Sequence, residues 1–61
     1  MNPVTIELDD IVFIKALQIL GTVIAIDFGA NIENDIYIVR CNYSYAIYNI
    51  LIGDLYKVER G

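Results

Sequence analysis

Two side chains of this 61-residue chain could act as nucleophiles, and neither has a partner that would activate it. Cys41 and Ser44 are the candidates, but the sequence contains no histidine to serve as their base. A solitary cysteine without histidine also cannot assemble a thiolate metal site. The four glycines form no phosphate-binding loop and no dinucleotide fingerprint. We therefore predict that the protein is not an enzyme, has no cofactor and no metal, and packs Cys41 as a small hydrophobe.

Paired carboxylates are the remaining candidates for acid–base chemistry. Asp9 stands beside Asp10, and Glu33 lies two residues before Asp35. Such pairs can exchange protons with a substrate when their environments separate their pKa values. Both pairs fall in predicted turns, where carboxylates usually face water. We expect no catalysis from either pair.

Tyrosines and one arginine are the best candidates for binding. Alternate residues of a strand share a face, so both faces of a predicted hairpin over residues 36–50 are largely apolar or aromatic. A small barrel can bury only one face, and the other is expected to pack on a neighbouring subunit or a partner. The alternative is that tyrosine rings merely cover a small core with their hydroxyls in water. The predicted binding residues are Tyr37, Arg40, Tyr43, Tyr45 and Tyr48, with the guanidinium of Arg40 suited to an anionic ligand group.

Size and composition point to self-association. A single domain over residues 1–61 buries only about 60% of its unfolded surface and is marginal without added support. Cys41 is alone, so no intrachain disulfide supplies that support. Hydrophobic residues make up 57% of the chain, above the usual 45–50% or so. These features favour both unusually dense apolar packing and self-association, and we predict a homo-oligomer.

The charge balance argues against nucleic-acid binding. The net charge is −4, with eight acidic residues against four basic ones scattered along the chain. A protein that neutralises phosphates normally presents a basic patch. We expect no direct contact with nucleic acid. The absence of a basic segment before the first apolar run and the unpaired cysteine favour a cytoplasmic location.

The most hydrophobic stretch, residues 11–26, admits three interpretations. As a membrane span it is short, and Lys15 and Gln18 interrupt it, so a single-span membrane peptide is the least favoured. A soluble helix over roughly residues 10–20 could begin at Asp9 or Asp10 and end before Gly21. The β-branched and aromatic residues and the lack of a clear polar face favour a strand instead. Gly21-Thr22 is then expected to form a turn.

Short strands are predicted along the whole chain, with turns between them. The sequence alternates apolar and polar residues at 4–8, β-branched residues dominate 22–26, and residues 36–41 are the clearest strand candidate. Turn-forming residues fill 27–35 and 42–44, a returning hairpin arm is expected at 45–50, and 51–55 is expected to form a turn that includes one turn of 3₁₀ helix. A last strand follows at 56–59. The expected fold is all-β, a small barrel of five or six strands, with an α+β fold carrying the 10–20 helix as the alternative.

The stretch from Leu20 to Val58 resembles small SH3-like barrels, including KOW-like modules and short phage-encoded proteins of that fold. The resemblance is carried by the strand opening at 20–24 (LGTVI), the central strand at 37–40 (YIVR) and the turn and final strand at 52–58 (IGDLYKV). KOW-type modules that bind nucleic acid are usually basic, whereas this chain is acidic. The resemblance implies the fold and a class of compact accessory proteins that inhibit or sequester by binding.

These observations predict a non-catalytic binding module, an oligomeric accessory protein of phage or mobile-element type. It would inhibit a host protein or sequester a small ligand. A structural subunit of a larger assembly is the alternative from a different class.

Overall fold

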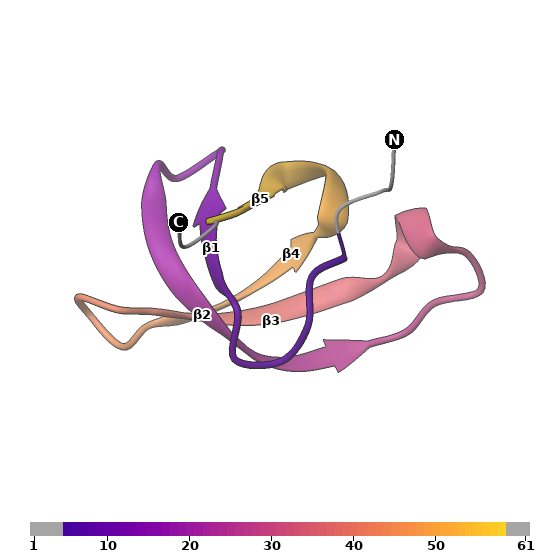
Figure 1. Ribbon diagram of the computed structural model, residues 1–61, viewed down its shortest axis with the longest axis horizontal. Coiled ribbons are helices and arrows are strands. Elements are labelled where there is room, and N and C mark those ends of the chain that lie inside the picture. Colours follow the sequence, from indigo (N-terminus) through magenta and orange to yellow (C-terminus); the bar gives the residue numbers. More distant parts are fainter. Residues whose placement is uncertain (1–4, 59–61) are drawn as a thin grey trace.

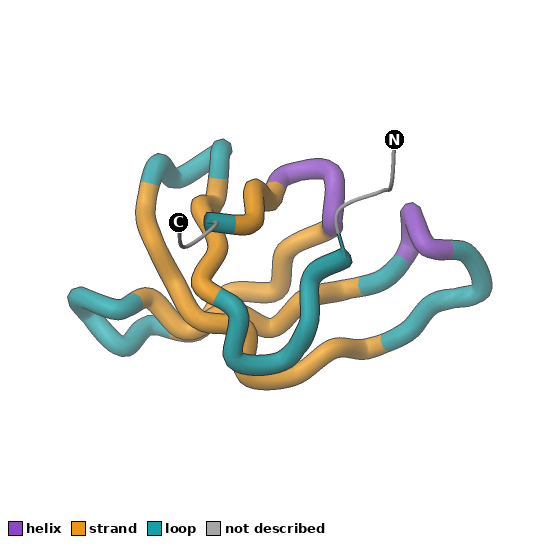
Figure 2. The backbone as a smooth tube through the Cα atoms, viewed as in Figure 1, coloured by secondary structure: helices purple, strands orange, loops and turns teal. Residues whose placement is uncertain are grey.

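Five antiparallel strands form one sheet in the computed structural model, which describes residues 5–58 (Figure 1). The spatial order is β4-β3-β2-β1-β5, so four strands form a meander and the last returns to pair with the first. The all-β prediction is confirmed, since helical segments in this described part of the chain are limited to two short 3₁₀ turns, η1 and η2 (Figure 2). The elements are β1 (Ile11–Ile14), β2 (Ile19–Asp27), η1 (Ile32–Asn34), β3 (Ile36–Cys41), β4 (Ile47–Leu51), η2 (Ile52–Asp54) and β5 (Leu55–Lys57).

The segment before β1 is not the predicted strand. Residues 5–8 pair with no other strand, and Val4 lies outside the described residues. The Asp10 carboxylate accepts a hydrogen bond from the Glu7 N–H at 2.7 Å, while the Asp10 N–H donates to the Glu7 carbonyl at 3.2 Å. Asp9 completes this turn in the left-handed region at φ 71°. The alternation at 4–8 therefore reflects one buried side chain, Ile6 at 5% exposure, and not a sheet face.

Residues 11–20 form a tight hairpin, so the helix alternative is wrong. β1 pairs with the start of β2, with Ile14 opposite Ile19. The helix-favouring residues 15–18 make the turn between them, which the Gln18 N–H closes on the Ile14 carbonyl at 2.7 Å. Gln18 adopts φ 56° there. Among residues 5–58, the structure contains no helix of the length and hydrophobicity that a bilayer span requires.

Gly21 lies inside β2 and does not form the turn expected there. A Cβ at this position would lie 2.4 Å from the Val39 Cγ1 and 2.9 Å from the Arg40 carbonyl oxygen. Glycine is therefore needed because β2 approaches β3 closely, and the chain does not turn at this point. Further along, the register between β2 and β3 shifts between Val23 and Ala25, the mark of a β-bulge.

The second half of the chain follows the sequence pattern closely. β3 spans the predicted 36–41, a turn occupies 42–44, and η2 supplies the expected 3₁₀ turn. β4 begins at Ile47, two residues later than predicted, because Tyr45 turns the chain at φ 61°. β5 starts one residue early, at Leu55, and Glu59 of the predicted strand lies outside the described residues.

The core lies on the concave side of the sheet, where β1, β5 and η2 fold over β2 and β3. Its buried hydrophobic members are Ile6, Val12, Ile14, Val23, Tyr37, Val39 and Leu55, with Ile19, Ile26, Tyr48, Ile50 and Ile52 packed against them. We call the other side of β2, β3 and β4 the outer face. By alternation and cross-strand register it comprises Thr22, Ile24, Ala25, Asp27, Ile36, Ile38, Arg40, Ile47, Asn49 and Leu51.

Candidate functional site

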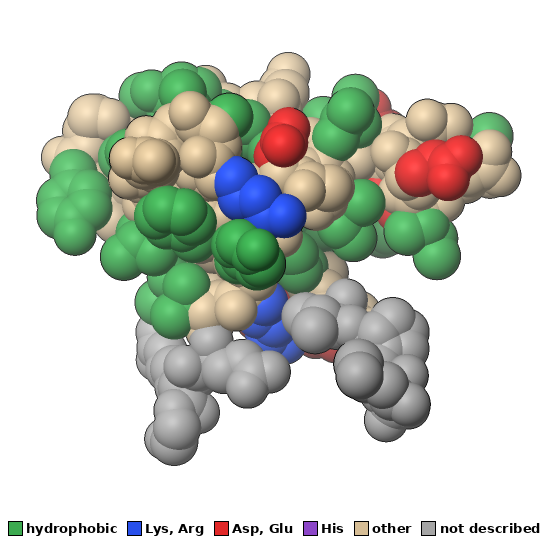
Figure 3. Space-filling view, turned by 90° about the horizontal axis from the view of Figure 1, so that it is seen from above, with side chains coloured by type: hydrophobic (Ala, Val, Ile, Leu, Met, Phe, Trp, Pro, Cys, Tyr) green, Lys and Arg blue, Asp and Glu red, His purple; other side chains and the backbone are tan. Residues whose placement is uncertain are grey.

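A pocket of about 730 Å³ opens between the N-terminal segment, the β2–β3 loop and η2. We call it the Asp35 pocket, after the only buried charged residue among those described. Exposed hydrophobic side chains are frequent on this small protein, and they cover much of the face seen from above (Figure 3). The pocket is lined by Thr5, Ile6, Glu7, Leu8, Ile26, Phe28, Ile32, Asp35, Tyr37 and Ile52.

The β2–β3 loop forms one wall of the Asp35 pocket, and it is held closed by a single carboxylate. The Asp35 Oδ1 accepts a hydrogen bond from the Gly29 N–H at 2.8 Å. A Cβ on Gly29 would lie 2.8 Å from both the Asn34 Cβ and the Asn34 carbonyl oxygen, so the loop is too tight for a larger residue. Within it, Phe28 and Ile32 remain 74% and 73% exposed although both line the pocket. These two side chains form an uncovered apolar rim.

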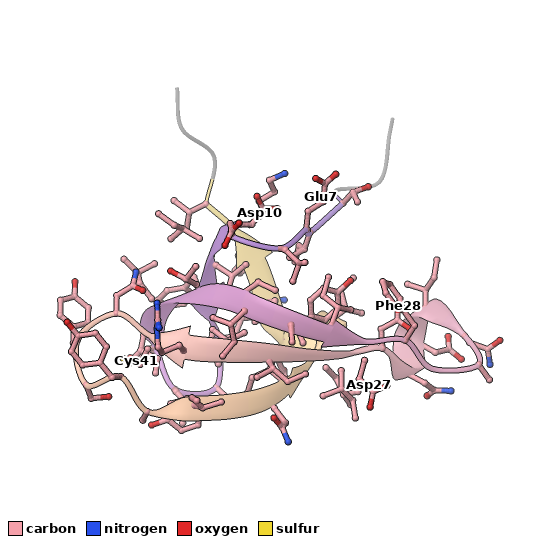
Figure 4. The ribbon with its side chains drawn as sticks, turned by 90° about the horizontal axis from the view of Figure 1, so that it is seen from below. Glu7, Asp10, Asp27, Phe28 and Cys41 are labelled. Atoms are coloured by element: carbon pink, nitrogen blue, oxygen red, sulfur yellow. The ribbon has the colours of Figure 1, made fainter. Side chains whose placement is uncertain are left out.

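Local alternation aims Phe28 at the pocket. Asp27 is the last residue of β2 and belongs to the outer face, because it pairs with Ile36. Figure 4 shows Phe28 on the opposite side of the ribbon from Asp27 and on the same side as Glu7. At the end of β2, Asp27 thus points to the outer face, and the next residue, Phe28, points to the side of the Asp35 pocket.

The electrostatic character of the Asp35 pocket is acidic. Asp35 is only 6% exposed, Glu7 also lines the pocket, and no lysine or arginine is among the lining residues. Burial, and to a smaller extent the charge of Asp35, raise the pKa of the Tyr37 phenol above 10.0. Tyr37 is therefore a neutral hydroxyl at physiological pH. The polar groups at this site suit a hydrogen-bond donor or a cation.

The five predicted binding residues do not converge on one site. Tyr37 lies in the core and lines the Asp35 pocket, and Tyr48 packs on the same inner side. Arg40 lies on the outer face, opposite Ile47. Tyr43 and Tyr45 lie in the β3–β4 connection, 78% and 72% exposed. Binding of an anionic ligand at Arg40 stays a prediction. The Asp35 pocket does not include Arg40, and no basic residue lines it.

Two of the candidate catalytic groups, Cys41 and Asp10, are held by local contacts, and the Ser44 side chain is among the hydrogen-bond partners of the Cys41 thiol. Cys41 is 3% exposed, although hydrogen bonds from the backbone N–H groups of Ser44 and Tyr43 lower the pKa of its thiol. The Asp10 carboxylate lies 3.3 Å from the Lys57 ammonium. The hydrogen bond from the Glu7 N–H, and less so Lys57, hold the pKa of Asp10 below its ordinary value. Within residues 5–58, no three histidine, cysteine or acidic side chains gather into a possible metal site.

Sequence reasoning missed most of the Asp35 pocket. Ile6, Phe28 and Ile52 come from three distant segments, and their contribution depends on the return of β5 to β1. Asp35 was expected to face water in a loop, yet it is buried against Gly29. The one available signal was the position of Asp35 directly before the strand predicted at 36–41. Comparison with known proteins returned no matching family model, no similar curated protein and no similar solved structure.

Proposed function

We propose that this protein is a non-catalytic binding module with an SH3-like barrel, and that the Asp35 pocket is its ligand site. The strand order, with β5 returning to β1, supports this architecture. The 3₁₀ turn η2 immediately before the last strand agrees with the segment on which the resemblance to such barrels rests.

The Asp35 pocket is the observation that carries the functional proposal. Its volume of about 730 Å³ falls within the roughly 300–1,000 Å³ of small-molecule sites. Its walls are mainly apolar, and a buried carboxylate and a neutral phenol supply a few fixed polar points. Covering Phe28 and Ile32 would remove two large apolar side chains from water, which favours a ligand with an apolar body.

The chemical groups of the Asp35 pocket favour binding of a ligand and not catalysis on it. Asp35 already uses one carboxylate oxygen to close its loop on Gly29, and the chain has no histidine to serve as a base. A neutral Tyr37 can donate or accept a hydrogen bond without transferring a proton. In this proposal the protein acts by binding alone. It sequesters a small ligand, or it binds a protruding side chain of a host protein in the Asp35 pocket.

A titration with three small aromatic probes tests the proposal. The probes 2-phenylethanol, 2-phenylethylamine and 3-phenylpropionate share a phenyl body and differ in charge. We expect amide chemical shifts in ¹⁵N-labelled protein to change around Ile6, Phe28 and Tyr37. The amine should bind most tightly, because Asp35 and Glu7 attract its charge, and the carboxylate least.

Two matched substitutions control the titration. Ile32→Thr removes part of the apolar rim and should weaken binding of every probe several-fold. Ile47→Thr makes the same change on the outer face and should leave binding unchanged. No saturable shift with any probe at millimolar concentration, or equal effects of the two substitutions, would refute the proposed ligand site.

A further inference from the structure

The outer face is an apolar surface that the core does not use. The core and the residues packed against it take Ile26, Tyr48 and Ile50 from the inner side of the same strands. On the outer side Ile47 is 59% and Leu51 49% exposed. Its six apolar members lie on three adjacent strands and are Ile24, Ala25, Ile36, Ile38, Ile47 and Leu51. Such a contiguous patch is a typical protein interaction surface.

One charged residue of each sign stands at opposite ends of this face. Asp27 pairs with Ile36 at one end of the β2–β3 ladder, and Arg40 pairs with Thr22 at the other. Within residues 5–58 neither makes an ion pair, since the described salt bridge joins Lys57 to Asp10. Ile38 lies midway between Ile36 and Arg40 on β3. The face is thus acidic at one end and basic at the other, and its central row across the strands is Ala25, Ile38 and Asn49.

We propose that a second copy of this chain covers the outer face, related by a two-fold axis that runs across the strands at Ile38. This rotation lays β3 antiparallel over β3 of the second copy, with Ile38 against Ile38. The Arg40 end of each copy then meets the Asp27 end of the other, giving two identical ion pairs, one on each side of Ile38. Two sheets that pack face to face in this way lie about 10 Å apart, a distance that long arginine side chains can bridge.

Charge complementarity selects this axis over the other symmetric arrangement. A two-fold axis along β3 would stack the strands in parallel, with Arg40 directly over Arg40 of the second copy. Like charges facing each other at an interface are unfavourable. The axis across the strands instead pairs opposite charges. Because Asp27 and Arg40 make the face neutral as a whole, the face does not require a strongly basic or acidic partner. A second copy is therefore the occupant that the face fits best.

The expected affinity is modest. A standard interface buries about 800 Å² on each partner, which is roughly a sixth of the 4506 Å² surface of this protein. The outer face spans three of the five strands, and we expect it to bury less than that. We expect a dimer with a micromolar dissociation constant, which sedimentation equilibrium between about 5 and 500 μM measures. Circular dichroism of each variant checks that it is folded.

Charge exchange between the two ends provides the decisive experiment. Arg40→Asp and Asp27→Arg should each weaken the dimer at least tenfold, because each places like charges together twice. An equimolar mixture of the two variants should form a heterodimer, and the chain carrying both substitutions should again form a homodimer. Ile47→Thr should weaken dimerisation, whereas Ile32→Thr at the pocket rim should not.

Three results would overturn the inference. The first is a wild-type protein that stays monomeric up to 500 μM. The second is an oligomer that both charge variants and Ile47→Thr leave intact, which would place the interface elsewhere. The third is a mixture of folded charge variants that does not associate. Probe binding at the Asp35 pocket is independent of all three, so it can succeed or fail separately.

Discussion

Replacing Gly21 by alanine should destabilise the fold, and the structure allows the size of the effect to be worked out. The added Cβ would meet the Val39 Cγ1 at 2.4 Å and the Arg40 carbonyl oxygen at 2.9 Å. Val39 is fully buried, so its methyl group cannot move into solvent. Overpacking of this kind costs about 1–3 kcal/mol, and the reduced freedom of the unfolded chain returns about 0.4–1 kcal/mol. We expect a net loss of about 1–2 kcal/mol.

That loss is large for a protein of this size. Sixty-one residues at about 0.05–0.15 kcal/mol each give a total stability of roughly 3–9 kcal/mol. Urea unfolding followed by circular dichroism measures the difference. Gly53→Ala is the matched control, because no atom lies within 4 Å of a Cβ built there and Gly53 does not have a positive φ. It should be neutral or slightly stabilising.

A double-mutant cycle then tests the cause. Val39→Ala alone should cost about 2–3 kcal/mol through the cavity it leaves. Combined with Gly21→Ala it should cost at least about 1 kcal/mol less than the sum, because the new methyl group occupies part of the vacated space. Equal stability of Gly21→Ala and Gly53→Ala, or strict additivity in the cycle, would refute the reasoning.

Three further predictions concern titrating groups. Asp10 has a folded pKa below its ordinary 3.8, so its contribution to stability is present above about pH 4 and is lost as the pH falls through the folded value. Asp10→Asn should therefore flatten the acid side of a stability–pH curve measured by urea unfolding, and an unchanged curve would contradict this. Asp35→Asn should lower the raised pKa of Tyr37 without restoring 10.0, because burial remains; ultraviolet titration at 295 nm against wild type measures the change, and a rise would contradict it. Cys41 should react with a thiol reagent at least a hundredfold more slowly in the native state than in denaturant, since access limits it despite a lowered pKa; equal rates would contradict this.

Strands set by local pattern could be predicted from the sequence, and features set by distant contacts could not. Residues 36–41 include three β-branched residues and no turn former, and β3 has those bounds. Residues 4–8 alternate, but Asp9 and Asp10 close a turn there that outweighs the pattern. The sequence predicts a turn at Gly21, because sequence alone cannot show that the Val39 side chain lies against this position in the sheet.

The Asp35 pocket illustrates the same division. Alternation predicted correctly that Tyr37 and Arg40 lie on opposite sides of β3, yet not which side faces the core. The burial of Asp35 depends on a backbone N–H six residues earlier, at Gly29, and no periodic pattern encodes that contact. Pocket walls that come from Ile6 and Ile52 require the whole sheet to be assembled first.

The pairing of the first strand with the last has a consequence for the lifetime of the folded state. β1 to β4 can form through successive local hairpins, whereas the pairing of Val12 with Lys57 must close most of the chain into a loop. We expect this long-range pairing to form late, after the local hairpins and after the folding barrier. Substitutions in β5 should therefore speed unfolding and leave refolding nearly unchanged, which chevron kinetics can measure. The three residues of β5 should therefore determine the unfolding rate, and with it the lifetime of the folded state, more than the folding rate.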